Sequence, residues 1–178
     1  QGRTFFAFGA ILLALLILRK KIIFNNYREW LRLMLSGIIL GVHWIAFFKS
    51  IQISTVAIGL LTFASYPLFT TFLEPLFFQE ELKKKNVTAV FFVIFGLALM
   101  ATSPSDNSYN IFSGSTIQGI LWGLAGGLGF ALLTLLNRGY VRNYSPLQLT
   151  CWQNGFAGMV LLPWSLAESW DFTVEEWV

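Results

Sequence analysis

The stretch that decides the fold runs from His43 to Lys85 and reads HWIAFFKSIQISTVAIGLLTFASYPLFTTFLEPLFFQEELKKK. It holds the second half of one apolar run, Leu33–Ile53, and all of another, Thr55–Phe78. Each run is long enough to cross a lipid bilayer, which takes about 20 apolar residues. Because the turn between the runs is very short, we expect two antiparallel helices side by side in a membrane.

Polar groups and a helix breaker lie near the middle of these two runs. His43 is near the middle of the first, and Ser65-Tyr66-Pro67 is near the middle of the second. Unpaired polar atoms in hydrocarbon cost several kcal/mol, so such groups normally face a protein interior or a water-filled cavity. In antiparallel helices these groups meet near the membrane midplane. The pattern suggests a substrate pathway across the membrane.

Composition places the chain among integral membrane proteins. It is 56% hydrophobic and 12% charged, whereas a soluble domain has about 25% charged residues. The single cysteine, Cys151, excludes an internal disulfide and a CxxC zinc motif. Basic residues cluster at the ends of apolar runs, which argues against a nucleic-acid-binding face. Since the chain begins at Gln1 in the middle of a pattern, we expect a fragment of a longer protein.

Six apolar runs are candidate transmembrane helices. They are Thr4–Leu18, Leu33–Ile53, Thr55–Phe78, Val87–Ser103, Ile117–Leu136 and Leu147–Trp164. Loops rich in Lys and Arg (Arg19–Arg32, Glu80–Asn86, Asn137–Tyr144) alternate with loops that have neither (Gln52–Thr55, Pro104–Thr116). Basic loops stay in the cytoplasm. The pattern predicts an all-α, multi-pass protein of the cell inner (plasma) membrane, with the lipid bilayer as a partner.

This topology predicts which loops can be labelled from outside the cell. Single cysteines placed in Pro104–Thr116 should react with a membrane-impermeant thiol reagent, whereas those in Lys83–Asn86 should not, because a membrane separates the two loops. Reaction of both loops from the same side would contradict the six-span arrangement.

The turn-forming segment Pro104–Thr116 reads as an external linker between two structural units, residues 1–104 and 105–178. A faint repeat supports this division, because the segments that begin at Arg3 and Gln153 share a pattern of small and apolar residues. The charge rule gives these two segments opposite orientations. Inverted repeats of this kind are typical of secondary transporters.

Five segments carry a family resemblance: Arg3-Thr-Phe-Phe-Ala, His43 to Ile58, Tyr66-Pro67-Leu-Phe, Phe78-Gln-Glu80-Glu-Leu, and Gly119 to Arg138. Together they resemble the EamA-type members of the drug/metabolite transporter superfamily. The resemblance implies ten helices in two inverted five-helix repeats that carry small metabolites, often outward. On this template residues 1–104 hold helices two to five, and residues 105–178 hold helices six and seven.

The expected function is secondary transport, by alternating access, of a small organic metabolite such as an amino acid or a related compound, with export as the expected direction. Proton coupling and a homodimer are further hypotheses, and no cofactor or metal is expected. One alternative is an integral membrane enzyme, which would need clustered Asp or His residues or a nucleophile with its base. The other is a scaffold subunit whose polar residues only hold helices together.

The candidate site residues come from both units. Candidates for substrate binding are His43, Trp44, Phe47, Thr62, Tyr66, Thr70, Trp122, Gln153 and Asn154, with Pro67 as a helix break and Arg3 and Glu74 as charge-coupling groups. An ionisable group at midplane depth is a functional candidate, although a lone histidine can also be structural. Residues 62, 66, 70 and 74 share one helical face, which suits either a cavity lining or bonding between helices.

Three of these residues also have a purely structural explanation. Pro67 deprives the Phe63 carbonyl of its helical partner, which indicates a local opening or a simple kink. Glu74 lies close enough to the cytoplasmic end for its carboxylate to reach water. Arg3 suits interface anchoring by default. The small-residue stripe Gly119, Gly123, Gly127 and Ala131 predicts close helix packing.

Overall fold

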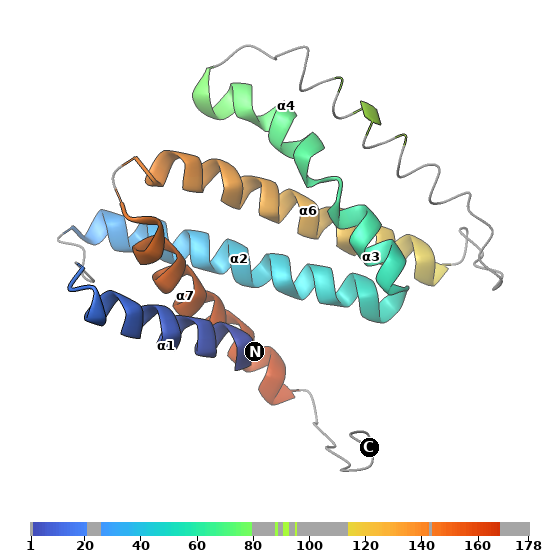
Figure 1. Ribbon diagram of the computed structural model, residues 1–178. Coiled ribbons are helices and arrows are strands. Elements are labelled where there is room, and N and C mark those ends of the chain that lie inside the picture. Colours follow the sequence, from blue (N-terminus) through green and yellow to red (C-terminus); the bar gives the residue numbers. More distant parts are fainter. Residues whose placement is uncertain are drawn as a thin grey trace.

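The computed structural model describes residues 2–20, 26–79, 88, 91–92, 95, 114–142 and 144–167. The main elements of this part of the chain are all helical, which confirms the predicted class (Figure 1). They are α1 (Gly2–Ile17), α2 (Tyr27–Ile53), α3 (Val56–Phe63), α4 (Tyr66–Phe78), α6 (Gly114–Tyr140) and α7 (Pro146–Ala167). The predicted run Val87–Ser103 and the loop Glu80–Asn86 lie largely or wholly outside the described residues.

Helices α2 and α6 form the centre of the bundle and run antiparallel along each other (Figure 1). Ser50 on α2 meets Gly119 near the start of α6, and His43 meets Gly126 two turns further along. Positions later in α6 therefore contact positions earlier in α2, as expected for antiparallel helices. This pairing joins helices that the sequence assigns to two different units.

Helices α7 and α1 cover one side of this central pair. Gly37 and Gly41 on α2 let α7 approach closely, because side-chain carbons of Phe156 and Val160 fill the space a Cβ would take. Because the later position in α2 contacts the later position in α7, the two helices are parallel. On the outer side of α7, α1 is antiparallel, with Phe8 in contact with Trp152.

The other side of α6 is covered by one predicted run that the structure divides into two helices. Thr55 caps α3, since its hydroxyl accepts a hydrogen bond from the Ile58 N–H at 3.2 Å. The helix stops at Phe63 and resumes at Tyr66, with Pro67 in the first turn of α4, where its missing N–H costs little. The predicted continuous run Thr55–Phe78 is therefore a broken helix.

Helices α3 and α4 run parallel to α6. Thr62 packs at Gly123, Tyr66 at Phe130, and Glu74 pairs with Arg138. Because α4 and α6 point the same way, the end of α4 and the start of α6 lie at opposite ends of the bundle (Figure 1).

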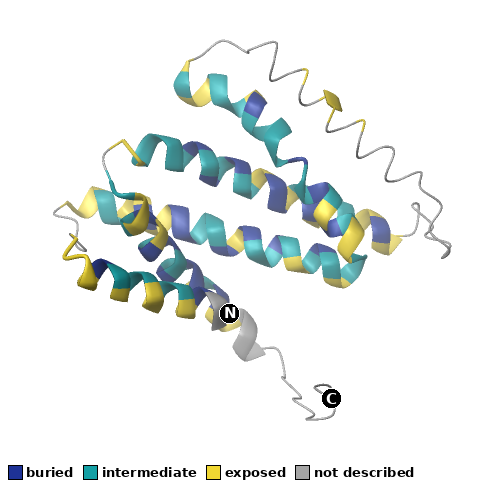
Figure 2. Cartoon of the chain, in the orientation of Figure 1, coloured by how far each residue is buried: buried dark blue, intermediate teal, exposed yellow. Residues whose placement is uncertain are grey.

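Three helical stretches of the described residues are long and apolar enough to cross a membrane: Tyr27–Ile53, Val56–Phe78 and Gly114–Tyr140. The predicted run Thr4–Leu18 appears as a shorter apolar helix, and Leu147–Trp164 lies within α7. Large apolar side chains are exposed, such as Phe6 at 79% and Leu76 at 76%. Exposed positions recur along the outer faces of the helices (Figure 2). Apolar outer surfaces of this extent are suited to lipid or to further helices.

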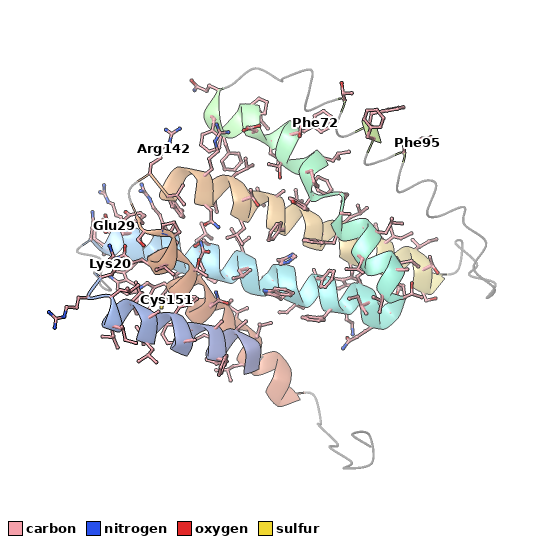
Figure 3. All side chains as sticks on the ribbon, in the orientation of Figure 1. Lys20, Glu29, Phe72, Phe95, Arg142 and Cys151 are labelled. Carbon is pink, nitrogen blue, oxygen red and sulfur yellow. The ribbon has the colours of Figure 1, made fainter. Side chains whose placement is uncertain are left out.

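The described parts of two basic loops lie at one end of the bundle. Lys20 after α1, Glu29 at the start of α2 and Arg142 between α6 and α7 lie at the same end (Figure 3). The helix directions agree with the alternating charge pattern, which requires the loops Arg19–Arg32 and Asn137–Tyr144 to share a side.

Candidate functional site

Six ring side chains gather where α2, α3, α4 and α6 meet, and we call this group the histidine cluster. Its members are His43, Trp44 and Phe47 from α2, Phe63 from α3, Tyr66 from α4 and Phe130 from α6. The centre of the His43 ring lies 5.2 Å from those of Trp44 and Phe130 and 5.3 Å from that of Phe63. His43 itself is only 3% exposed.

Tyr66 joins this cluster through rings that it shares with His43. Its ring centre lies 5.0 Å from that of Phe130 in an edge-on arrangement and 5.5 Å from that of Phe63 in a stacked one. The predicted meeting of His43 and Tyr66 at a common depth thus takes place through two intervening phenylalanines. Such ring pairs add about 0.5–1.5 kcal/mol each beyond the area they bury.

Two side chains of α2 reach the backbone of α6. His43 donates from Nδ1 to the Gly126 carbonyl at 2.8 Å, and Ser50 donates from Oγ to the Gly119 carbonyl at 2.7 Å. A carbonyl oxygen has a second lone pair, so it can accept these bonds in addition to its helical partner. The two bonds fix the depth of α2 against α6 at the level of the cluster.

The hydroxyl groups around the helix break bond to nearby carbonyls of their own segment. Thr62 donates to the Ile58 carbonyl at 2.7 Å, Ser65 to the Thr62 carbonyl at 2.5 Å, and Thr70 to the Tyr66 carbonyl at 3.0 Å. Back-bonding of this kind satisfies a hydroxyl in an apolar setting. Of the predicted polar face at residues 62, 66, 70 and 74, three members contact α6: Thr62, Tyr66 and Glu74. The hydroxyl groups at 62 and 70 bond to carbonyls of their own segment.

A second polar group lies nearer the basic end and joins α2, α6 and α7. The Gln153 amide nitrogen donates to Oγ of Ser36 at 3.1 Å and to Oδ1 of Asn137 at 2.6 Å. Ser36 in turn donates to the Leu33 carbonyl at 2.9 Å. Ser36 and Gln153 are buried, so this network acts as an internal tie among three helices.

An ion pair links α4 to α6 at the same end. Glu74 accepts from the guanidinium of Arg138, which also lies over the Phe78 ring with its central carbon 4.5 Å from the ring centre. The side chain of Arg138 is 37% exposed and that of Glu74 is 24% exposed. Glu74 therefore has a defined partner and keeps part of its side chain exposed, and its role in charge coupling stays a prediction.

The candidate residues fall into several separate places. The cluster gathers His43, Trp44, Phe47 and Tyr66, while Thr62 packs at Gly123 and Thr70 bonds to the Tyr66 carbonyl. Gln153 belongs to the network near the basic end. Trp122 is 41% exposed, and the Asn154 amide donates to the Thr150 carbonyl of its own helix. Arg3 lies in α1, and its side chain is outside the described residues.

Sequence reasoning missed the partners that α6 supplies. Phe130 and Gly126 complete the surroundings of His43, while Asn137 and Arg138 bind Gln153 and Glu74. A signal was present, because residues 119, 123, 126, 130 and 137 recur at spacings of three, four and seven along one helix, and residue 138 is next to the last of them. Of these residues only Gly119 and Gly123 were identified from the sequence, as part of a packing stripe.

Comparison with known proteins adds the family. The model of the EamA-like transporter family matches residues 2–102 and 117–178. The "Uncharacterized transporter YxxF" of Bacillus subtilis (strain 168) is 29% identical over 136 residues, which cover 76% of this chain and 42% of that protein. The "Uncharacterized transporter YyaM" of the same organism is 27% identical over 166 residues, 90% of this chain and 53% of that protein. The chain thus spans about half the length of these relatives. No solved structure matches it.

Proposed function

Because the chain belongs to the EamA-like transporter family, a family of membrane transporters and not of enzymes, we propose that the full-length protein is a secondary carrier. It moves a small organic metabolite, such as an amino acid or a related compound, by alternating access in the plasma membrane, with export as the proposed direction. The chain supplies six of ten crossings, with residues 1–104 in the first repeat and 105–178 in the second.

The observation that carries this proposal is the histidine cluster beside a helix break. An ionisable side chain, a tyrosine and an interrupted helix meet deep within three apolar helices. Transporters commonly form substrate sites from interrupted helices near the midplane, because the break frees polar backbone groups. A scaffold subunit has no need for a break at this place.

The break also offers a means of movement. Helix α4 can change its angle to α3 at Ala64 and Ser65 while α3 stays packed on α6 at Gly123 and Gly127. Hinges of this kind are short segments at the ends of helices that absorb a change in backbone dihedrals. Rocking α4 away from α6 would open the cluster from the basic end.

The test is a transport assay with the full-length protein in vesicles and a panel of metabolites. We expect saturable, side-dependent transport of at least one compound. Tyr66→Phe keeps the ring contacts but removes the hydroxyl, so transport affinity should fall by about two- to tenfold, the effect of one lost hydrogen bond of about 0.5–1.5 kcal/mol.

The control is Phe72→Leu, an exposed position two turns further along the same helix. It should insert and transport like the wild type. An absence of saturable transport across the panel, or equal activity of Tyr66→Phe and the wild type on every transported compound, would count against the proposed site.

A further inference from the structure

The hydrogen bond of His43 fixes which of its ring nitrogens carries the proton. Its partner, the Gly126 carbonyl, can only accept, so Nδ1 must donate. A neutral imidazole has one N–H, which leaves Nε2 as an acceptor with a free lone pair. The contact with α6 thus selects the tautomer that presents an acceptor at the other side of the ring.

The imidazole that carries this acceptor is surrounded by aromatic rings. The hydrogen bonds of the described residues include none at Nε2, and the ring of His43 lies among those of Phe47, Phe63 and Phe130. Every fully buried side-chain nitrogen or oxygen in the described part of the chain has a partner. It follows that Nε2, which has none there, keeps a little accessible surface.

We propose that His43 divides two roles between its nitrogens: Nδ1 anchors α2 to α6, and Nε2 accepts a hydrogen bond from the transported molecule. This rests on the proposed transport function and adds the chemistry of the substrate. The molecule carries an N–H or O–H donor on an apolar or aromatic body, because the other members of the cluster present aromatic rings, with the Tyr66 hydroxyl as a further polar group. A carboxylate at this place would set its own lone pairs against the lone pair of Nε2, and no hydrogen bond could form. Any acidic group of the transported molecule would therefore lie away from Nε2.

Two substitutions distinguish the role of Nδ1 from that of Nε2. In His43→Asn the amide nitrogen takes the place of Nδ1 and keeps the bond to the Gly126 carbonyl, but nothing occupies the place of Nε2. In His43→Gln the amide group reaches the place of Nε2 and the anchor at Nδ1 is lost. We expect His43→Asn to melt near the wild-type temperature while its KM for the compound identified in the panel rises about two- to tenfold. His43→Gln should show a lowered melting temperature with a smaller change in KM.

The control is Ser50→Ala, which removes the other bond from α2 to the α6 backbone, at Gly119. It should lower the melting temperature and leave KM unchanged. A His43→Asn protein with wild-type KM, or a change in KM for Ser50→Ala as large as that for His43→Asn, would overturn the division of roles.

A measurement on the unaltered protein removes any dependence on how the variants fold. The transported compound and its methylated analogue, in which the donor hydrogen is replaced by a methyl group, are compared as competitors for transport. The analogue should compete about two- to tenfold less well. Equal competition would overturn the proposal even if transport itself is established, whereas a panel without any transported compound would instead contradict the transport function.

Discussion

Gly123→Leu should prevent α6 from packing against α3 and should remove most of the folded protein. A Cβ on Gly123 would overlap the Thr62 side chain and come within 3.0 Å of the Ser50 hydroxyl. Neither neighbour can move freely, because the Thr62 hydroxyl bonds to the Ile58 carbonyl and that of Ser50 to the Gly119 carbonyl. Inserting bulk into a packed interior usually costs about 1–3 kcal/mol and more when backbones must separate. The measurement is the melting temperature and the monodisperse fraction of the full-length protein in detergent.

Gly139 supplies the matched control on the same helix. A Cβ at this position would meet nothing within 4 Å, so Gly139→Leu should insert and melt like the wild type. Gly123→Ala is the milder step, and Thr62→Ala should restore part of its lost stability by removing the hydroxyl that overlaps. Normal folding of Gly123→Leu would show that α3 and α6 do not pack as the structure has them.

Much of the fold could be read from the sequence because lipid imposes a simple rule on it. Apolar runs of sufficient length predicted the helices, and the alternation of basic loops predicted their directions. The structure agrees for α2, α6 and the pair α3–α4. The break at Ala64 and Ser65 was foreshadowed by Pro67, since a proline cannot donate to the carbonyl four residues earlier. Its position before the proline follows from the preference of proline for the first turn of a new helix.

The site was harder to predict because it depends on which helices touch. The pairing of α2 with α6 places Gly126 and Phe130 beside His43, although more than 80 positions separate His43 from Gly126. A sequence pattern along one helix does not reveal the partner across an interface. For the same reason Gln153 and Asn154, adjacent in sequence, differ in their surroundings: Gln153 faces Ser36 on α2, and Asn154 bonds within α7.

In the proposed carrier, the ion pair between Glu74 and Arg138 would control opening at the basic end. It joins α4, beyond the helix break, to the end of α6, and thus links the two proposed repeats. The next residue back on α6, Asn137, is held by Gln153 on α7. The end of α6 is therefore tied to α7 on one side and to α4 on the other. Because both charges are partly exposed, the pair contributes only about 0–1 kcal/mol, a size that would suit a contact that forms and breaks in each cycle of the proposed carrier.

Arg138→Glu should consequently trap the carrier with its basic end open. Two carboxylates would then face each other, and the contact of Arg138 with Phe78 would be lost as well. Loss of the pair and repulsion together amount to roughly 1–2 kcal/mol, or about a 5- to 30-fold shift between closed and open forms. Transport in vesicles should fall by a similar factor, and a cysteine at Thr70 should react faster with a thiol reagent added on the cytoplasmic side.

The exchanged pair, Glu74→Arg with Arg138→Glu, should return transport and the reactivity of this cysteine most of the way to their wild-type values. Arg142→Glu, an exposed change of equal charge at the same end, should alter neither transport nor reactivity. If the exchanged pair is as defective as Arg138→Glu alone, then a role of Arg138 other than pairing with Glu74 limits transport, and the ion pair is not the contact that closes this end.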